Sequence, residues 1–422
     1  MTGPPEPRPE WVQAINRGEV VPIAEVARLP LGRDALVAEA RAGLGLDDGA
    51  GVGAIDGDES FVDSLDVVLR ALEEEAELTL IGRWMTRRFL VRLLEVRFQL
   101  AAYVQADPGV RDEEIRAPLV VTGAPRTGTT ILYGTLACDP ALRAPEGWEF
   151  LRPLPPPRAD RFPDGARLDL ADRELRMMAT VVSGLDAVHE YHGRMPKECL
   201  SAMSFAFLSE EFTARYHVPS YVAHLTTSDM RPAYEMHRLV LQVLQRRYSG
   251  VRWLLKSPVH LHALPTLLSV YPDARLVVTH RDPLTVLGSV TSLVATLRWA
   301  HSDRVDVAEI GRYHEQLYLR DLDGLVTATE AGALDPTRVH HGRYQEFVTD
   351  PMAAVQAVYT GLGMELTPDA ERAMSAHLQA RPKGAKGAHD YDFADLGLDP
   401  DVERARFARY CRAFGVREEV TA

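Results

Sequence analysis

Apolar residues recur at helical spacing through most of this chain, and only a few short runs are continuously apolar. From Ser60 to Gln105 they return every three or four positions, with an interruption near Gly82. This spacing predicts helices that bury one face. Similar patterns extend from Trp11 to about Gly45 and from Asp160 to Gly250, so most of the chain is expected to be helical.

Short apolar and β-branched runs predict buried strands, and helical patterns follow them. The expected strands are 119–121, 251–256, 274–280 and a strand and loop at 339–347. The expected helices are 130–137, 260–270, 284–298, 305–329, 351–362 and 368–379. Strands that alternate with helices need right-handed crossovers and form a parallel sheet. The pattern therefore predicts an α/β fold with a central parallel sheet.

The chain divides into segments of different character. We expect a helical N-terminal extension over residues 1–110 that packs on the core, and an α/β domain over 111–400. A helical substrate-side insertion is expected at 151–250, and a C-terminal helix or tail at 401–422. For the extension, plain structural packing is favoured over a part in an acceptor pocket.

Composition limits the classes of partner. The chain has 422 residues, 46% of them hydrophobic, and a net charge of −13. Nucleic acids, sulfated glycans and anionic membranes are bound by basic surfaces, so this charge disfavours them and any anion site must be local.

Cysteine usage and the longest uncharged run indicate a cytoplasmic protein. Cys138, Cys199 and Cys411 are widely separated and form neither a metal-binding spacing nor a disulfide framework. The N-terminal residues lack the apolar core of a signal peptide, and the run from Pro283 to Leu297 is too short to span a bilayer.

The segment after the first strand carries the strongest chemical signal. Gly123 and Gly128 have the spacing of a phosphate-binding loop, but Thr129 stands where that pattern has its lysine. Hydrolysis of ATP or GTP needs that cation at the transferred phosphate, so its loss disfavours such activity. The nearest cation is Arg126, inside the loop. The alternative is an ordinary strand, turn and helix with two glycines.

Two further cations follow predicted strands. Lys256 ends the strand that begins at Val251, and Arg281 follows the strand that ends at His280. In parallel sheets, ligands bind beyond the carboxyl ends of the strands. Arg126, Lys256 and Arg281 are therefore expected to lie together at one edge of the sheet.

Four segments, in order, resemble those of sulfotransferases that use 3′-phosphoadenosine 5′-phosphosulfate (PAPS), and the likeness is strongest to the bacterial and tyrosylprotein-like branches. Pro125–Thr130 is similar to the loop around the 5′-phosphosulfate, and Leu255–Pro258 to the strand-end lysine segment. Val277–Ser289 resembles the 3′-phosphate motif, and Arg343–Pro351 the tyrosine segment near the adenine. The Lys- and Gly-rich residues 381–391 resemble the flap over the nucleotide.

The resemblance implies a P-loop-like, three-layer fold and a PAPS site without a metal. The residues it implies for nucleotide binding are Arg126, Thr127, Gly128, Thr129, Thr130, Arg281, Ser289, Tyr344, Lys383 and Lys386. It implies in-line transfer of the sulfuryl group to a hydroxyl of a small-molecule or lipid-like acceptor, and leaves a homodimer open. Arg126 and Lys256 would neutralise charge on the leaving phosphate.

The residue that accepts the acceptor's proton stays open. Glu146 ranks first, because the resemblance places the base of the tyrosylprotein branch near it, and His260 ranks second because it follows Lys256 closely. Further candidates are Glu149, His189, His192 and Glu198. For each one, an ordinary structural or surface role is the competing interpretation.

Two other functions compete with sulfuryl transfer. A nucleotide kinase or other P-loop phosphotransferase is disfavoured by Thr129 and by the lack of an acidic strand end for Mg²⁺. A non-catalytic nucleotide-binding protein is disfavoured by the joint presence of Arg126, Lys256, Arg281 and Ser289.

Overall fold

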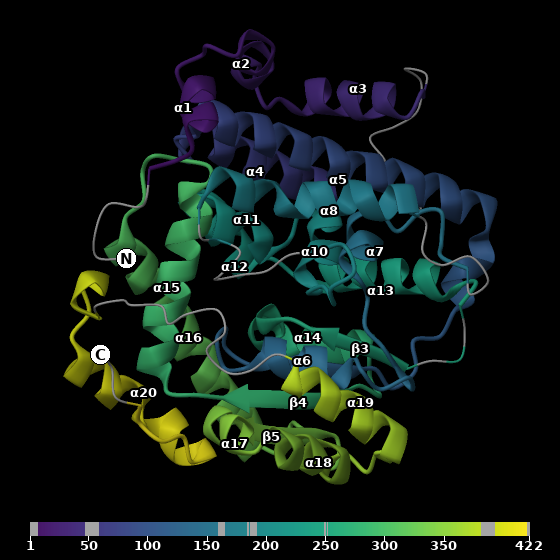
Figure 1. Cartoon of the computed structure of the whole chain (residues 1–422), viewed down its shortest axis with the longest axis vertical. Coiled ribbons are helices and arrows are strands. Elements are labelled where there is room, and N and C mark those ends of the chain that lie inside the picture. The colour runs from purple at the N-terminus through teal and green to yellow at the C-terminus, as the bar shows by residue number, and fades with distance from the viewer. Residues whose placement is uncertain are drawn as a thin grey trace.

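The computed structural model has a parallel sheet in one half and a large helical layer in the other (Figure 1). It describes residues 7–46, 59–158, 165–183, 185, 192–248, 250, 252–380 and 393–419. The strands are β1 (Leu119–Thr122), β2 (Leu142–Arg143), β3 (Arg252–Lys256), β4 (Arg275–His280) and β5 (Val339–Arg343). They form a five-stranded sheet in the order β2-β3-β1-β4-β5, with every pair parallel. The predicted α/β fold with a central parallel sheet is confirmed.

Alternate residues of the central strands face two different helix layers. Leu119 and Val121 pack in one cluster with α6 (Thr129–Leu136), α17 (Tyr344–Thr349), α18 (Pro351–Gly361) and α19 (Pro368–Gln379). Val120 and Leu255 belong to the larger core on the other face. That face is covered by α13 (Arg231–Gln245), α14 (Leu264–Val270), α15 (Pro283–Trp299), α16 (Val307–Glu330) and α20 (Pro400–Phe414). The period of two in side-chain direction explains why these strands are apolar throughout.

The N-terminal extension and the insertion form the helical half. The extension contains α1 (Glu10–Asn16), α2 (Val21–Arg28), α3 (Arg33–Gly43), α4 (Phe61–Glu74), α5 (Leu80–Ala106) and η1 (Pro108–Asp112). The helix α7 (Gly147–Leu151) leads into the insertion. The described helices of the insertion are α8 (Gly165–Val181), α10 (Leu200–Met203), η2 (Ser204–Ala206), α11 (Glu210–Arg215) and α12 (Pro219–Thr227), followed by α13. The long helix α5 lies between α1–α3 on its outer side and the insertion (Figure 1).

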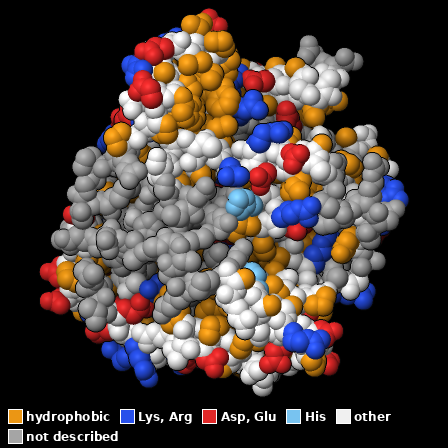
Figure 2. Space-filling model, in the orientation of Figure 1, with side chains coloured by type: hydrophobic (Ala, Val, Ile, Leu, Met, Phe, Trp, Pro, Cys, Tyr) orange, Lys and Arg blue, Asp and Glu red, His pale blue; other side chains and the backbone are white. Residues whose placement is uncertain are grey.

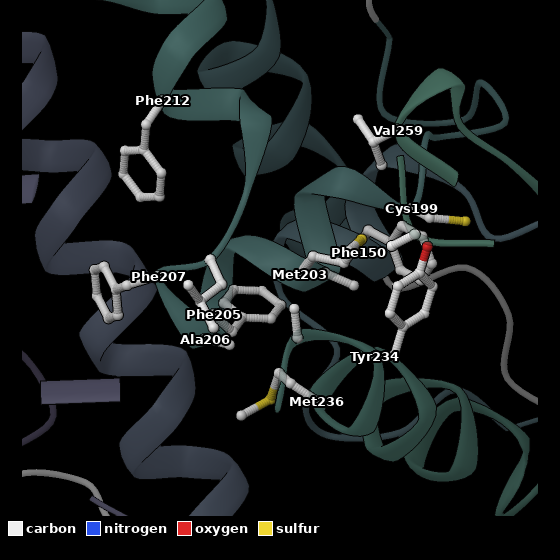
Figure 3. Close-up of a cluster of buried hydrophobic side chains, with 14 of the residues drawn as sticks. Phe150, Cys199, Met203, Phe205, Ala206, Phe207, Phe212, Tyr234, Met236 and Val259 are labelled. Atoms are coloured by element: carbon white, nitrogen blue, oxygen red, sulfur yellow. The ribbon is translucent and has the colours of Figure 1, made fainter. Parts of the chain in front are cut away.

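Aromatic rings join the insertion to the extension. The ring of Phe212 lies 5.6 Å from that of Phe89 on α5, and the ring of Phe207 lies 6.0 Å from that of Phe61 on α4. Figure 3 shows Phe207 and Phe212 at the end of a continuous buried cluster that reaches Cys199 and Tyr234. This cluster extends the core from the extension to the segment beside β3.

Several local expectations were wrong. The helical pattern breaks between Glu74 and Leu80, whereas Gly82 lies in the first turn of α5, where its N–H donates to the Thr79 hydroxyl at 3.2 Å. The helix expected from His260 begins as η3 (Pro258–Ala263) before α14. Tyr344 begins helix α17 instead of extending a loop, and β2 was missed because two residues make no pattern.

Gly82 is needed where α5 meets the backbone after α15. A Cβ atom built on Gly82 would lie 2.0 Å from the carbonyl oxygen of His301, which is backbone and cannot rotate away. The apparent helix breaker is therefore a point of close approach between two helical segments.

We expect Gly82→Ala to lower the free energy of unfolding by about 1–3 kcal/mol, because the added methyl group overpacks this contact. Gly324→Ala is the matched control, since Gly324 lies inside α16 and a Cβ there meets no atom within 4 Å. That control should raise stability by roughly 0.5–1 kcal/mol through helix propensity. Urea denaturation measures both, and equal effects of the two substitutions would contradict the packing explanation.

Candidate functional site

The loop between β1 and α6 is held to the neighbouring strand. The Thr127 hydroxyl donates to the carbonyl of Ala124 at 2.7 Å and lies 2.6 Å from the hydroxyl of Thr279 on β4. Gly128 caps α6 with a φ of 88°, and a Cβ there would meet the ring of Tyr344 at 3.0 Å. The first N–H groups of a helix lack intrahelical partners, so this fixed turn is suited to an anion.

Three residues predicted for nucleotide binding lie together around this loop. Arg126 has a left-handed φ of 67°, and its Nε donates to the Ser289 hydroxyl on α15 at 2.9 Å. The Arg126 carbonyl accepts a hydrogen bond from Nη1 of Arg281 at 2.9 Å. The loop, the end of β4 and the helix after it are thus joined through side chains that can bind anions.

Arg281 has a carboxylate on its planar donor edge and an aromatic ring on its face. Its Nε and Nη2 donate to the carboxylate of Glu419 at 2.9 and 2.8 Å. Its guanidinium carbon lies 3.9 Å from the centre of the Tyr344 ring. Glu419 follows α20 and gave no sequence signal, because a single glutamate in a terminal tail carries no pattern.

Lys256 ends β3 as a buried cation. It is 2% exposed, its Nζ donates to the Thr130 hydroxyl at 3.0 Å, and it forms an ion pair with the carboxylate of Glu198. Thr130 lies in the first turn of α6, so Lys256 is directed at the same helix start as the loop. In the described part of the chain, the carboxylate that contacts Lys256 is that of Glu198.

Glu146, ranked first as the base, caps a helix. Its side chain accepts the backbone N–H of Glu149 and also accepts from Trp148 Nε1 at 2.7 Å. Glu149 in turn accepts the N–H of Glu146 at 2.9 Å and binds Arg143 at 2.6 Å. Burial raises the pKa of Glu146. These contacts give both glutamates a structural function at the start of α7.

His260, ranked second, is fully buried beneath the site. Its Nδ1 lies 2.9 Å from the Tyr234 hydroxyl, and its Nε2 has no hydrogen-bond partner among the described residues. Burial lowers the pKa of His260 well below its usual value. His192 lies 3.6 Å from Asp172 on α8, while His189, Lys383 and Lys386 fall outside the described residues.

His262, two residues after His260, is held between two carboxylates. Its Nδ1 contacts Asp321 of α16, and its Nε2 lies 2.7 Å from Glu210 of α11. Burial alone would lower the pKa of His262, but the two carboxylates raise it to about 10. This buried imidazolium therefore ties the segment after Lys256 to two helices.

Within the described ranges, no group of three or more His, Cys, Asp or Glu side chains is arranged to hold a metal ion. In the same part of the chain, no helix combines the length and apolar character needed to cross a membrane. The site described above offers anion-binding N–H groups, cations and a carboxylate.

Known proteins with similar sequences are sulfotransferases. The profile described as "Sulfotransferase family" matches residues 118–368, which is more than half of the chain. "Omega-hydroxy-beta-dihydromenaquinone-9 sulfotransferase Stf3" of Mycobacterium tuberculosis (strain CDC 1551 / Oshkosh) is 27% identical over 283 residues, which are 63% of this chain and 65% of that protein. The alignment thus spans less than two thirds of the length of this curated relative.

Two solved structures have the same fold. Sulfotransferase STF1 from Mycobacterium tuberculosis H37Rv is 30% identical and superposes with a TM-score of 0.76, over 89% of this chain and 98% of that one. Sulfotransferase STF9 from Mycobacterium avium is 27% identical with a TM-score of 0.80, over 92% of this chain and 97% of that one.

We expect the contribution of His262 to stability to depend on pH. Folding raises the pKa of His262 from the usual 6.5 to about 10, so the charged imidazolium stabilises the folded protein fully below about pH 6.5. That stabilisation is lost as the pH rises through about 10, where the folded imidazolium also loses its proton. The difference in unfolding free energy between wild type and His262→Gln, measured by urea denaturation, should therefore shrink between these values. A constant difference would show that the buried imidazole is neutral.

Proposed function

The chain belongs to the sulfotransferase family, and on that premise we propose that it transfers the sulfuryl group of PAPS to a hydroxyl of a small or lipid-like acceptor. The observation that carries this proposal is the meeting of Arg126, Ser289, Arg281 and Lys256 around one loop. The mycobacterial relative is named for a lipid-like ω-hydroxy compound, which supports the acceptor class. Transfer of ³⁵S from labelled PAPS to a lipid extract of the host tests it directly.

In the proposed donor site, each predicted group binds one part of PAPS. The loop N–H groups, Arg126 and Lys256 bind the 5′-phosphosulfate, while Arg281 and Ser289 bind the 3′-phosphate. The adenine lies toward Tyr344, which lines a cavity of about 60 Å³ together with Gly128 of the loop and Phe347. Lys383 and Lys386, outside the described residues, stay a prediction for the flap.

The reaction is a displacement at sulfur. The acceptor oxygen forms a bond to sulfur while the bond to the bridging oxygen breaks, and that electron pair leaves with adenosine 3′,5′-bisphosphate. Lys256 stabilises the negative charge that develops on the bridging oxygen. Because Lys256 is buried at the strand end, this interaction is weakly screened by water.

We assign Glu198 as the base that takes the acceptor's proton, in place of Glu146 and His260. Glu198 contacts Lys256, and a donor that engages Lys256 leaves this carboxylate beside the reacting atoms. Glu146 is occupied as a helix cap, and His260 is bonded to Tyr234 in the core. Cys138, Cys199 and Cys411 are thiols in the structure, which supports a reducing compartment, and we place the reaction in the cytoplasm.

The 3′-phosphate site yields a prediction about the bisphosphate product. Arg281→Ala and Ser289→Ala should each weaken its binding without Mg²⁺, the first by roughly 10- to 100-fold because a charged hydrogen bond is lost. Isothermal titration calorimetry measures this. Equal affinity for nucleotides with and without the 3′-phosphate would contradict the assignment.

Glu419 supplies a second prediction for the same site. Its carboxylate accepts from the Nε and Nη2 donors of Arg281, which a 3′-phosphate needs. Glu419→Gln should therefore raise bisphosphate affinity by about two- to fivefold, the magnitude expected for a partly exposed ion pair. Glu418→Gln is the matched control, because Glu418 is exposed and lies 3.6 Å from Arg404 instead. Identical affinities in the two variants would show that Glu419 does not compete.

The assignment of the base makes a third prediction. Glu198→Gln should lower turnover by roughly 10²-fold or more, because the acceptor keeps its proton, while bisphosphate affinity is not reduced. Glu146→Gln should mainly lower stability, by about 1 kcal/mol, through the weakened helix cap. If Glu146→Gln loses more turnover than Glu198→Gln at equal stability, the base is Glu146.

A further inference from the structure

A cavity of about 610 Å³ lies in the helical half of the molecule. Its walls come from α3 and α5 of the extension and from α8, the end of α7 and α11 of the insertion. The extension, for which the sequence favoured plain packing, thus supplies two of the walls. A volume of this size is typical of pockets that enclose a small organic molecule.

The mouth of this cavity is charged, and apolar side chains form the larger part of its wall. Exposed side chains of opposite charge, Glu39, Arg88 and Arg173, line the outer part. Figure 2 shows acidic and basic side chains mixed on the face that this half presents. The apolar lining is formed by Trp84, Met85, Phe89, Val91, Leu151, Leu170, Leu175, Met177 and Met178. Methionine and aromatic walls adapt to apolar ligands of varied shape.

The inner end of the cavity is ionic and buried. Lys197, Arg92 and Glu211 are each at most 9% exposed and line it together with Arg215, which pairs with Glu211. Burial lowers the pKa of Lys197 to about 8. Burial would raise the pKa of Glu211, but the surrounding cations, with Arg215 and Lys197 first among them, lower it to about 2. An oxygen of a ligand is a suitable further partner for such buried cations.

The same backbone segment joins this inner end to the proposed sulfuryl site. Lys197 lines the cavity, and the next residue, Glu198, contacts Lys256. The Lys197 carbonyl accepts from the hydroxyl of Tyr133 on α6 at 3.1 Å, and the N–H of Cys199 donates to the Lys256 carbonyl at 3.0 Å. The segment at Lys197 and Glu198 therefore runs between the polar end of the cavity and the strand end and helix of the proposed sulfuryl site.

We infer that this cavity binds the acceptor, an amphiphilic alcohol whose hydroxyl is directed to the Lys197 end and whose apolar body lies along the methionine and aromatic walls. The inference rests on the proposed function and adds the class of acceptor to it. A hydroxyl at one end of an apolar chain fits these linings, because the buried cations can donate to an oxygen and the methionine and aromatic walls contact the chain. The carboxylates of Glu95 and Glu174, which also line the cavity, are paired with Arg152. A longer tail would leave through the charged mouth.

Equilibrium dialysis with radiolabelled 1-decanol tests this inference on the full chain. Leu170→Trp fills the apolar part of the cavity and should weaken decanol binding by roughly tenfold or more, since the ligand and the indole occupy the same space. Asp169→Trp is the matched control, because Asp169 is the adjacent exposed residue of α8 and does not line the cavity. Its decanol affinity should equal that of wild type.

Calorimetry with adenosine 3′,5′-bisphosphate on the same variants separates this inference from the proposed function. Unchanged bisphosphate affinity in Leu170→Trp shows that the donor half of this variant is folded. If Leu170→Trp is not folded, Met177→Trp replaces it in the test. Decanol binding that is absent from wild type, or equal in the two tryptophan variants, overturns the acceptor cavity whatever the nucleotide does. Wild type that binds decanol in this cavity but no bisphosphate overturns the sulfotransferase proposal instead.

Discussion

The parallel pairing of β1 between β3 and β4 is the constraint on which the site depends. The register places Val121 opposite both Lys256 and Val277, so the loop after β1 lies between the ends of two neighbouring strands. A slip of one residue would turn each buried side chain toward the opposite helix layer and would disrupt the packing of both apolar clusters. Hydrophobic packing therefore brings the cations to one edge, although their mutual repulsion opposes it.

Local compensation makes this concentration of positive charge compatible with an acidic chain. Lys256 pairs with Glu198 from the insertion, and Arg281 pairs with Glu419 from the C-terminal segment. Both partners come from outside the sheet and the loop. In the proposed reaction the donor takes over these cations, so the protein exchanges internal carboxylates for phosphate and sulfate oxygens.

The helical half holds the segment that contacts the end of β3. The insertion passes Lys197 and Glu198 between the large cavity and the end of β3, while the aromatic cluster around Phe212 fixes it to α5. The extension is held in turn by the close contact of Gly82 with the His301 backbone. The residues proposed to act on donor and acceptor are thus positioned by the same continuous core.

The sequence by itself determined the parallel α/β core, the loop after β1 and the gathering of Arg126, Lys256 and Arg281, because apolar runs and strand-end residues are local signals. It did not reveal that Glu146 caps a helix, that Glu198 meets Lys256, or that Glu419 lies on Arg281. These contacts join segments that lie far apart in the chain or depend on the turn that a backbone adopts. Periodicity reports which side of an element is buried and not which partner buries it, so only the tertiary structure decided them.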